Sequence, residues 1–145
     1  MTHATARPAA FDAALPTPLP LDDAGRLLLF VTRRMAVGGI DDAHAQHALL
    51  IRFRIGYRRP LVLLRAMMLE LSRCATGPIQ VAPCCCPRMT AGEAMLIDAA
   101  RNVANDPHAA HEALATVLGT PDCLGALVTL QAVGEAFADA GVLLS

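Results

Sequence analysis

Segments with apolar residues at helical spacing, each bounded by a capping residue or by glycine and proline, follow one another along most of this chain. Apolar residues that recur three and four positions apart form one face of an α-helix, and Gly or Pro beside such a segment ends it. Six segments fit this description, and no two strand-like segments are joined by a hairpin turn. Because short connections favour antiparallel neighbours, the sequence predicts an all-α fold, a compact bundle of about six antiparallel helices.

The helix boundaries follow from capping residues and helix breakers. Thr90 and Glu93 form a capping-box pattern, while Asp106 before Pro107 and Thr120 before Pro121 are typical helix starts. We expect helices over residues 22–38, 42–56, 60–77, 90–105, 106–119 and 120–141. The periodicity fails over the Pro-rich residues 78–88, which predicts an extended connector there.

Length and composition limit the domain organisation. The 145 residues suit one domain, and 54% hydrophobic against 17% charged residues excludes disorder along the whole chain. Residues 1–21 carry four prolines and no apolar face, so we expect a flexible Pro/Ala-rich arm before a single helical domain over residues 22–145. The arm lacks a secretory signal pattern, and the longest uncharged stretch, 74–87, is interrupted by Gly and Pro. A cytoplasmic protein without a membrane span is therefore expected.

The net charge of -1 conceals two oppositely charged parts of the chain. Residues 26–88 contain ten arginines and three acids, a charge of +7, whereas residues 89–145 carry -6 and residues 1–25 carry -2. The turn between the second and third helices concentrates the positive charge in Arg52, Arg54, Arg58, Arg59 and Arg65. Such a cluster suits a phosphate, an acidic protein surface or the acidic half of another copy. The alternative is a solvated face that pairs with acidic helices of the same molecule. With 3% aromatic residues and near-neutral charge, nucleic acid is not an expected partner.

Cysteine and histidine side chains form a second candidate site. In a reducing cytoplasm cysteines are thiols or metal ligands. If consecutive helices alternate strictly up and down, all five cysteines and one histidine pair lie at the same end of the bundle. Thiolates and imidazoles suit zinc, copper(I) or iron–sulfur centres. The candidate ligands are Cys74, Cys84, Cys85, Cys86, Cys123, His44 and His47. Their spacing differs from zinc modules with two Cys-x-x-Cys pairs, so packing as small apolar side chains is the competing interpretation.

Function is constrained mainly by what the sequence lacks. It contains no serine nucleophile elbow, glycine-rich phosphate loop or His-Glu-x-x-His pattern. We therefore expect a non-enzymatic interaction or regulatory protein without a cofactor, which self-associates or binds another protein. The alternative is a thiol-based metal-binding or redox-sensing protein that uses the cysteine cluster at 84–86, with zinc or copper as the metal.

Four stretches carry a resemblance to a known family. They are residues 26–35 (RLLLFVTRRM), 58–65 (RRPLVLLR), 82–90 (APCCCPRMT) and 122–127 (DCLGAL). Together they resemble a small bacterial protein family of unknown function, with the CCCPRMT stretch as its most distinctive segment. The resemblance implies no activity, cofactor or catalytic residue.

Overall fold

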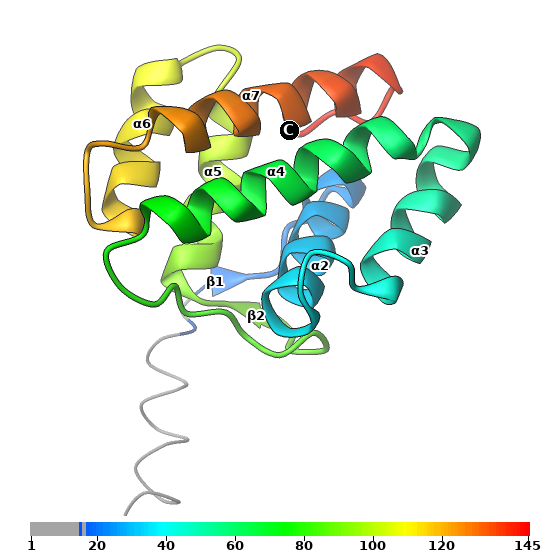
Figure 1. Ribbon diagram of the computed structural model, residues 1–145, viewed down its shortest axis with the longest axis horizontal. Helices are drawn as coiled ribbons and strands as arrows, with labels where there is room; N and C mark the ends of the chain where they lie inside the picture. Colours follow the sequence, from blue (N-terminus) through cyan, green and yellow to red (C-terminus); the bar gives the residue numbers. More distant parts are fainter. Residues whose placement is uncertain (1–14, 16) are drawn as a thin grey trace, which may run out of the picture.

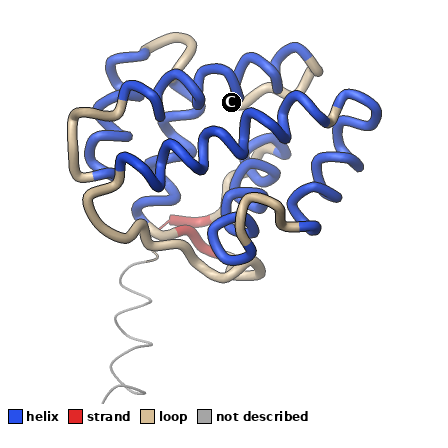
Figure 2. The backbone as a smooth tube through the Cα atoms, in the orientation of Figure 1, coloured by secondary structure: helices blue, strands red, loops and turns tan. Residues whose placement is uncertain are grey.

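The computed structural model describes Leu15 and residues 17–145, and this part of the chain is almost entirely helical (Figure 1, Figure 2). The predicted all-α class is confirmed. The helices are α2 (Asp23–Gly38), α3 (Ala43–Phe53), α4 (Arg58–Cys74), α5 (Ala91–Asn102), α6 (Pro107–Leu118) and α7 (Leu124–Asp139), with a 3-10 turn, η1 (Arg54–Gly56), between α3 and α4.

Side-chain caps start four of these helices as the sequence predicts. The carboxylates of Asp22, Asp42 and Asp106 each accept a hydrogen bond from the backbone amide three residues later, at 2.9, 2.9 and 3.1 Å. At α5, the Thr90 amide donates to Glu93 Oε1 at 2.9 Å and the Glu93 amide donates to Thr90 Oγ1 at 3.0 Å. These bonds satisfy amides that have no partner within the first helical turn.

Several helix boundaries differ from the prediction; α4 ends at Cys74 and α5 at Asn102, each three residues before the expected end. α3 ends at Phe53, three residues early, because the chain tightens into η1. α4 begins two residues before Pro60, with Arg58. α7 begins at Leu124 because the residues before it form a separate turn: the Thr120 amide donates to Ala115 of α6, and Thr120 Oγ1 accepts from the next-but-one amide at 3.2 Å. A Thr-Pro pair therefore ends one helix here instead of starting the next.

Helices far apart in sequence form the closest pair. α4 and α7 lie side by side and antiparallel across the front of the molecule, whereas α5 with α6 and α2 with α3 form helical hairpins (Figure 1). Arg59 Nη1 lies 2.7 Å from Asp139 Oδ2, which joins the start of α4 to the end of α7. α4 packs mainly against α7 and much less against its sequence neighbour α3. Because the two helices run antiparallel, the end of α4 lies beside the start of α7, as the alternation assumed for the cysteines requires.

One apolar core lies between these pairs. Phe53 and Phe137 pack at its edge with ring centroids 5.1 Å apart. Side chains that are less than 2% exposed come from all six helices and include Leu28, Leu49, Leu64, Met67, Ile97, Leu114, Leu130 and Phe137. Such complete burial by every helix accounts for most of the high apolar content.

A short antiparallel sheet closes the lower side of the fold. Strand β1 (Thr17–Pro18) pairs with β2 (Arg88–Met89), and Leu15 just before it is only 5% exposed. The end of the expected arm is thus packed against the helical domain, while residues 1–14 and 16 lie outside the described residues. Among the described helices, none is long and apolar enough to cross a membrane.

Candidate functional site

The structure places the predicted arginine cluster where α3, η1 and α4 meet. Arg59 is engaged by Asp139, and Arg65 donates to the Ile40 carbonyl at 2.9 Å and lies 3.4 Å from Asp41. These two arginines fit the interpretation of pairing within the molecule.

The other three arginines of the cluster remain available. Arg52, Arg54 and Arg58 are exposed and form no salt bridge with any residue that the structure describes. Exposed Ile51 and Ile55 lie among them in the chain. We call these five residues the basic end. Its three uncompensated charges are what remains of the predicted cluster as a binding surface.

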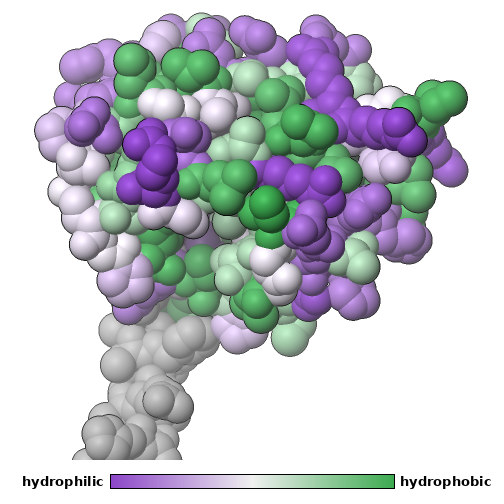
Figure 3. All heavy atoms as spheres, viewed as in Figure 1, coloured by the Kyte–Doolittle hydropathy of each residue, from purple (hydrophilic) through white to green (hydrophobic). Residues whose placement is uncertain are grey.

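The turn at the basic end holds an apolar side chain in solvent. Ile55 is 97% exposed, and Figure 3 shows hydrophobic atoms projecting beside hydrophilic ones at this end of the molecule. Arg54 has φ 57°, the only positive φ of a non-glycine residue in the described chain. Backbone in that region is strained and persists where surrounding structure imposes it. Here the link of four residues from α3 to α4 imposes it, so Ile55 stays at the apex.

An acidic and apolar stripe runs along the outer side of α7. Leu124 and Val128 are 67% and 55% exposed, and Glu135 continues the same face because residues three, four and seven apart share one side of a helix. Exposed Asp122 precedes the helix. Neither carboxylate forms a salt bridge with a described residue. We call these four residues the α7 stripe. Like the basic end, it combines exposed apolar side chains with charged side chains, but its charges are negative.

The cysteines fall into two groups. Cys74 ends α4 and Cys123 caps α7, so both lie where these neighbouring helices begin and end. The other group, Cys84 to Cys86, lies in the turn before β2, below α2 in Figure 1. There the Cys84 side chain contacts Arg34, and the Cys86 carbonyl accepts from Arg33 at 2.9 Å.

The predicted single ligand cluster is therefore not assembled. Among the described residues, no three His, Cys, Asp or Glu side chains gather closely enough to hold a metal ion. His44 and His47 are exposed on α3. The physical reason is the extended connector after α4, which carries Cys84 to Cys86 away from the end of α4 to the turn before β2, while Cys74 stays near Cys123.

Two cysteines have clearly different surroundings. Burial raises the pKa of the Cys123 thiol, and the nearby Cys74 and Asp122 raise it further. A thiol with a raised pKa carries little thiolate, the reactive form. Cys85, by contrast, is exposed. Cys123 therefore acts as a packing residue in the core, as the competing interpretation of the cysteines expected.

Sequence reasoning missed a buried ion pair that joins three segments. Arg33 Nε lies 2.7 Å from Glu93 Oε2, with the two side chains 2% and 5% exposed. Arg33 also donates to the carbonyls of Cys86 and Arg88, at 2.9 and 2.7 Å. The available signal was the spacing of Arg33, four residues after the buried Leu29, which places it on the inward side of α2.

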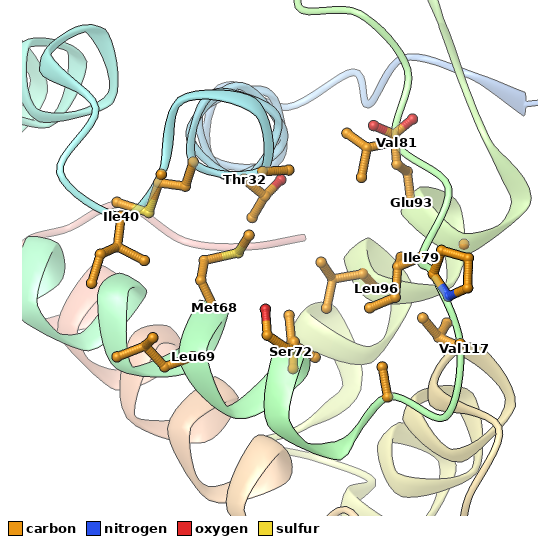
Figure 4. A pocket seen from close by; sticks show the side chains of 18 residues that line it. Thr32, Ile40, Met68, Leu69, Ser72, Ile79, Val81, Glu93, Leu96 and Val117 are labelled. Atoms are coloured by element: carbon orange, nitrogen blue, oxygen red, sulfur yellow. The ribbon is translucent and has the colours of Figure 1, made fainter.

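Sequence reasoning also missed an apolar cavity between α2, α4, α5 and the connector before β2 (Figure 4). Its walls come from segments up to 85 positions apart, from Thr32 to Val117, and no local pattern brings them together.

Comparison with known proteins places the chain in a family without assigning it an activity. Residues 7–142 match a family of unknown function, DUF6628, and the chain belongs to that family. No curated protein and no solved structure matches the chain.

Proposed function

We propose that this chain is a non-enzymatic, cytoplasmic interaction protein that self-associates head to tail, the basic end of one copy binding the α7 stripe of the next. The uncompensated arginines around the exposed Ile55 are the observation that carries the proposal. A cytoplasmic location is supported by five unpaired cysteines, one of them exposed, because free thiols persist in reducing compartments.

Charge complementarity favours a second copy as the partner. The basic end offers three arginines without salt bridges, and the α7 stripe offers Asp122 and Glu135, which form no salt bridge within the described chain, although the Arg73 charge lies near Asp122. Opposite charges steer encounter and fix orientation more than they add affinity. Binding should therefore weaken as salt screens it, since the Debye length falls from about 10 Å at 0.1 M to about 3 Å at 1 M.

Apolar side chains supply the second part of the match. Ile55 would leave water on contact with Leu124 and Val128 of the neighbouring copy, and removing apolar area from water stabilises association at about 25 cal/mol per Å². Because the two surfaces differ, the contact is heterologous, and repeating it builds chains or rings. A twofold dimer would instead need one surface that matches itself.

Sedimentation velocity over a broad protein concentration range tests the proposal. We expect the mass to rise with concentration at 0.1 M salt and to fall at 1 M salt. The variant Arg52→Gln/Arg58→Gln lacks two of the three charges of the basic end and keeps Arg54 in the turn, and Asp122→Asn/Glu135→Gln lacks both charges of the α7 stripe. Each alone should stay monomeric, whereas an equimolar mixture should form heterodimers and nothing larger.

A matched variant controls for the general loss of positive charge. Arg26→Gln removes an exposed arginine from the first turn of α2 and should associate like the parent protein. A monomeric mass at every concentration would overturn the proposal. So would binding of the monomer to vesicles of anionic lipid without any association in solution, because the basic end would then serve a lipid surface.

A further inference from the structure

A partly open cavity lies between α2, α4, α5 and the connector before β2, and several of its lining residues reach solvent. Its volume is about 550 Å³, and its walls are mostly apolar: Met35, Met68, Leu71, Ile79, Leu96 and Val117 all line it (Figure 4). Protein interiors otherwise pack with few voids larger than a water molecule. Small-molecule pockets, by contrast, fall between about 300 and 1,000 Å³ and are lined mainly by apolar side chains.

The polar groups of the cavity limit the chemistry of a ligand. Thr32 donates to the Leu29 carbonyl at 2.9 Å, and both Glu93 oxygens are engaged by Arg33 and by backbone amides. The Ser72 side chain lines the cavity but is exposed, so its hydroxyl, which has no partner among the described residues, is open to water; Figure 4 shows its oxygen directed into the cavity. No arginine lines the cavity.

One wall of the cavity is not helical. Residues 77–81 pass over it as an extended strap that joins α4 to the turn before β2. The strap is fixed near its ends: the Thr76 amide donates to the Leu118 carbonyl at 2.9 Å, and the Gln80 carbonyl accepts from Thr90 Oγ1 at 2.9 Å. A second hollow of about 290 Å³ adjoins the cavity and shares Pro78, Ile79, Gly92 and Val117 with it. Such a wall can adjust to a ligand without disturbing helix packing.

We propose that this cavity binds a neutral, largely apolar small molecule that carries one polar group, which hydrogen-bonds to Ser72. The volume corresponds to roughly 18 non-hydrogen atoms if each takes the ~30 Å³ that a water molecule occupies in the liquid. An anion would find no cation in the wall, and a cation would find Glu93 already paired with Arg33. The proposal is independent of self-association.

Fluorescence titration with the neutral apolar probe N-phenyl-1-naphthylamine tests the cavity in the full chain. We expect saturable binding and displacement by 1-octanol at least tenfold more effectively than by octanoate, which has the same chain but a charge. Ser72→Ala should weaken displacement by 1-octanol about fivefold, the effect of one hydrogen bond, while leaving the affinity of the probe nearly unchanged.

Two variants that fill the cavity make the test decisive. Ala36→Phe enters from the α2 wall and Ser72→Phe from the α4 wall, and both positions are exposed enough to accept the larger side chain. Either should reduce probe binding at least tenfold. The matched control is Val37→Phe, one residue along α2 but outside the lining, which should bind like the parent. Unsaturable binding, equal loss in Val37→Phe, or displacement by octanoate as strong as by 1-octanol would overturn the proposal.

Discussion

Replacing Arg33 with methionine is the most informative perturbation of this fold. Its guanidinium donates to Glu93 Oε2 at 2.7 Å and Oε1 at 3.0 Å, and to the carbonyls of Cys86 and Arg88. The side chain is only 2% exposed, and methionine has a comparable length without charge. The substitution therefore leaves the Glu93 carboxylate buried without its counter-charge while disturbing packing little.

The expected cost follows from that uncompensated charge. Removing one partner of a buried pair costs about 3–5 kcal/mol, a large part of the ~5–15 kcal/mol by which an ordinary domain is stable. The carbonyls of Cys86 and Arg88 add little, because both residues reach solvent and their carbonyls can bind water instead. The melting temperature should fall by about 10 °C or more.

Urea unfolding followed by circular dichroism measures this cost. The double variant Arg33→Met/Glu93→Gln removes the charge but keeps an amide oxygen for the Thr90 amide, so it should be more stable than Arg33→Met alone. The double-mutant cycle should give a coupling of about 2 kcal/mol or more. A loss below about 1 kcal/mol for Arg33→Met, with an unchanged denaturant slope, would refute the reasoning.

Three further outcomes are expected. Thr90→Ala removes one half of the capping box and should lower the free energy of unfolding by about 1 kcal/mol, measured by urea unfolding. With a colorimetric disulfide reagent, the exposed Cys85 should react fast, and this fast phase should diminish in Cys85→Ser. Cys123, whose pKa is raised by burial, should react only when the protein unfolds. Hydrogen bonds from Arg34 and the Ala45 amide lower the pKa of Asp42. The stabilisation that the charged Asp42 carboxylate gives to the fold is therefore present at neutral pH and should disappear as pH falls below about 4. The urea midpoints of the parent and of Asp42→Asn should then converge.

The local sequence predicted the helices well because caps and breakers act within a few residues. Asp22, Asp42 and Thr90 bond to amides three positions away, so their effect depends little on the rest of the fold. The prediction was wrong where two local signals compete. Thr120 fits a helix start, yet its amide completes the end of α6, and α7 begins only at Leu124.

The candidate site was predicted in part. The arginine cluster was predicted from charge density, but no local pattern divides it into the paired Arg59 and Arg65 and the remaining three. That division depends on Asp139, 80 positions away from Arg59. The cysteine cluster rested on an assumed order of helix packing; the pairing of α4 with α7 brings Cys74 near Cys123, whereas the connector after α4 carries Cys84 to Cys86 away from both.

The sequence alone determined the fold class, the four helix starts that carry side-chain caps and the charge of the basic end, because each depends on residues within one or two turns of one another. Only the tertiary structure decided which helices pair, which charges are compensated and where the core leaves a cavity. The Arg33–Glu93 pair spans 60 positions and the cavity wall 85. Contacts at such separations are set by how all the apolar faces pack together, and no single segment contains that information.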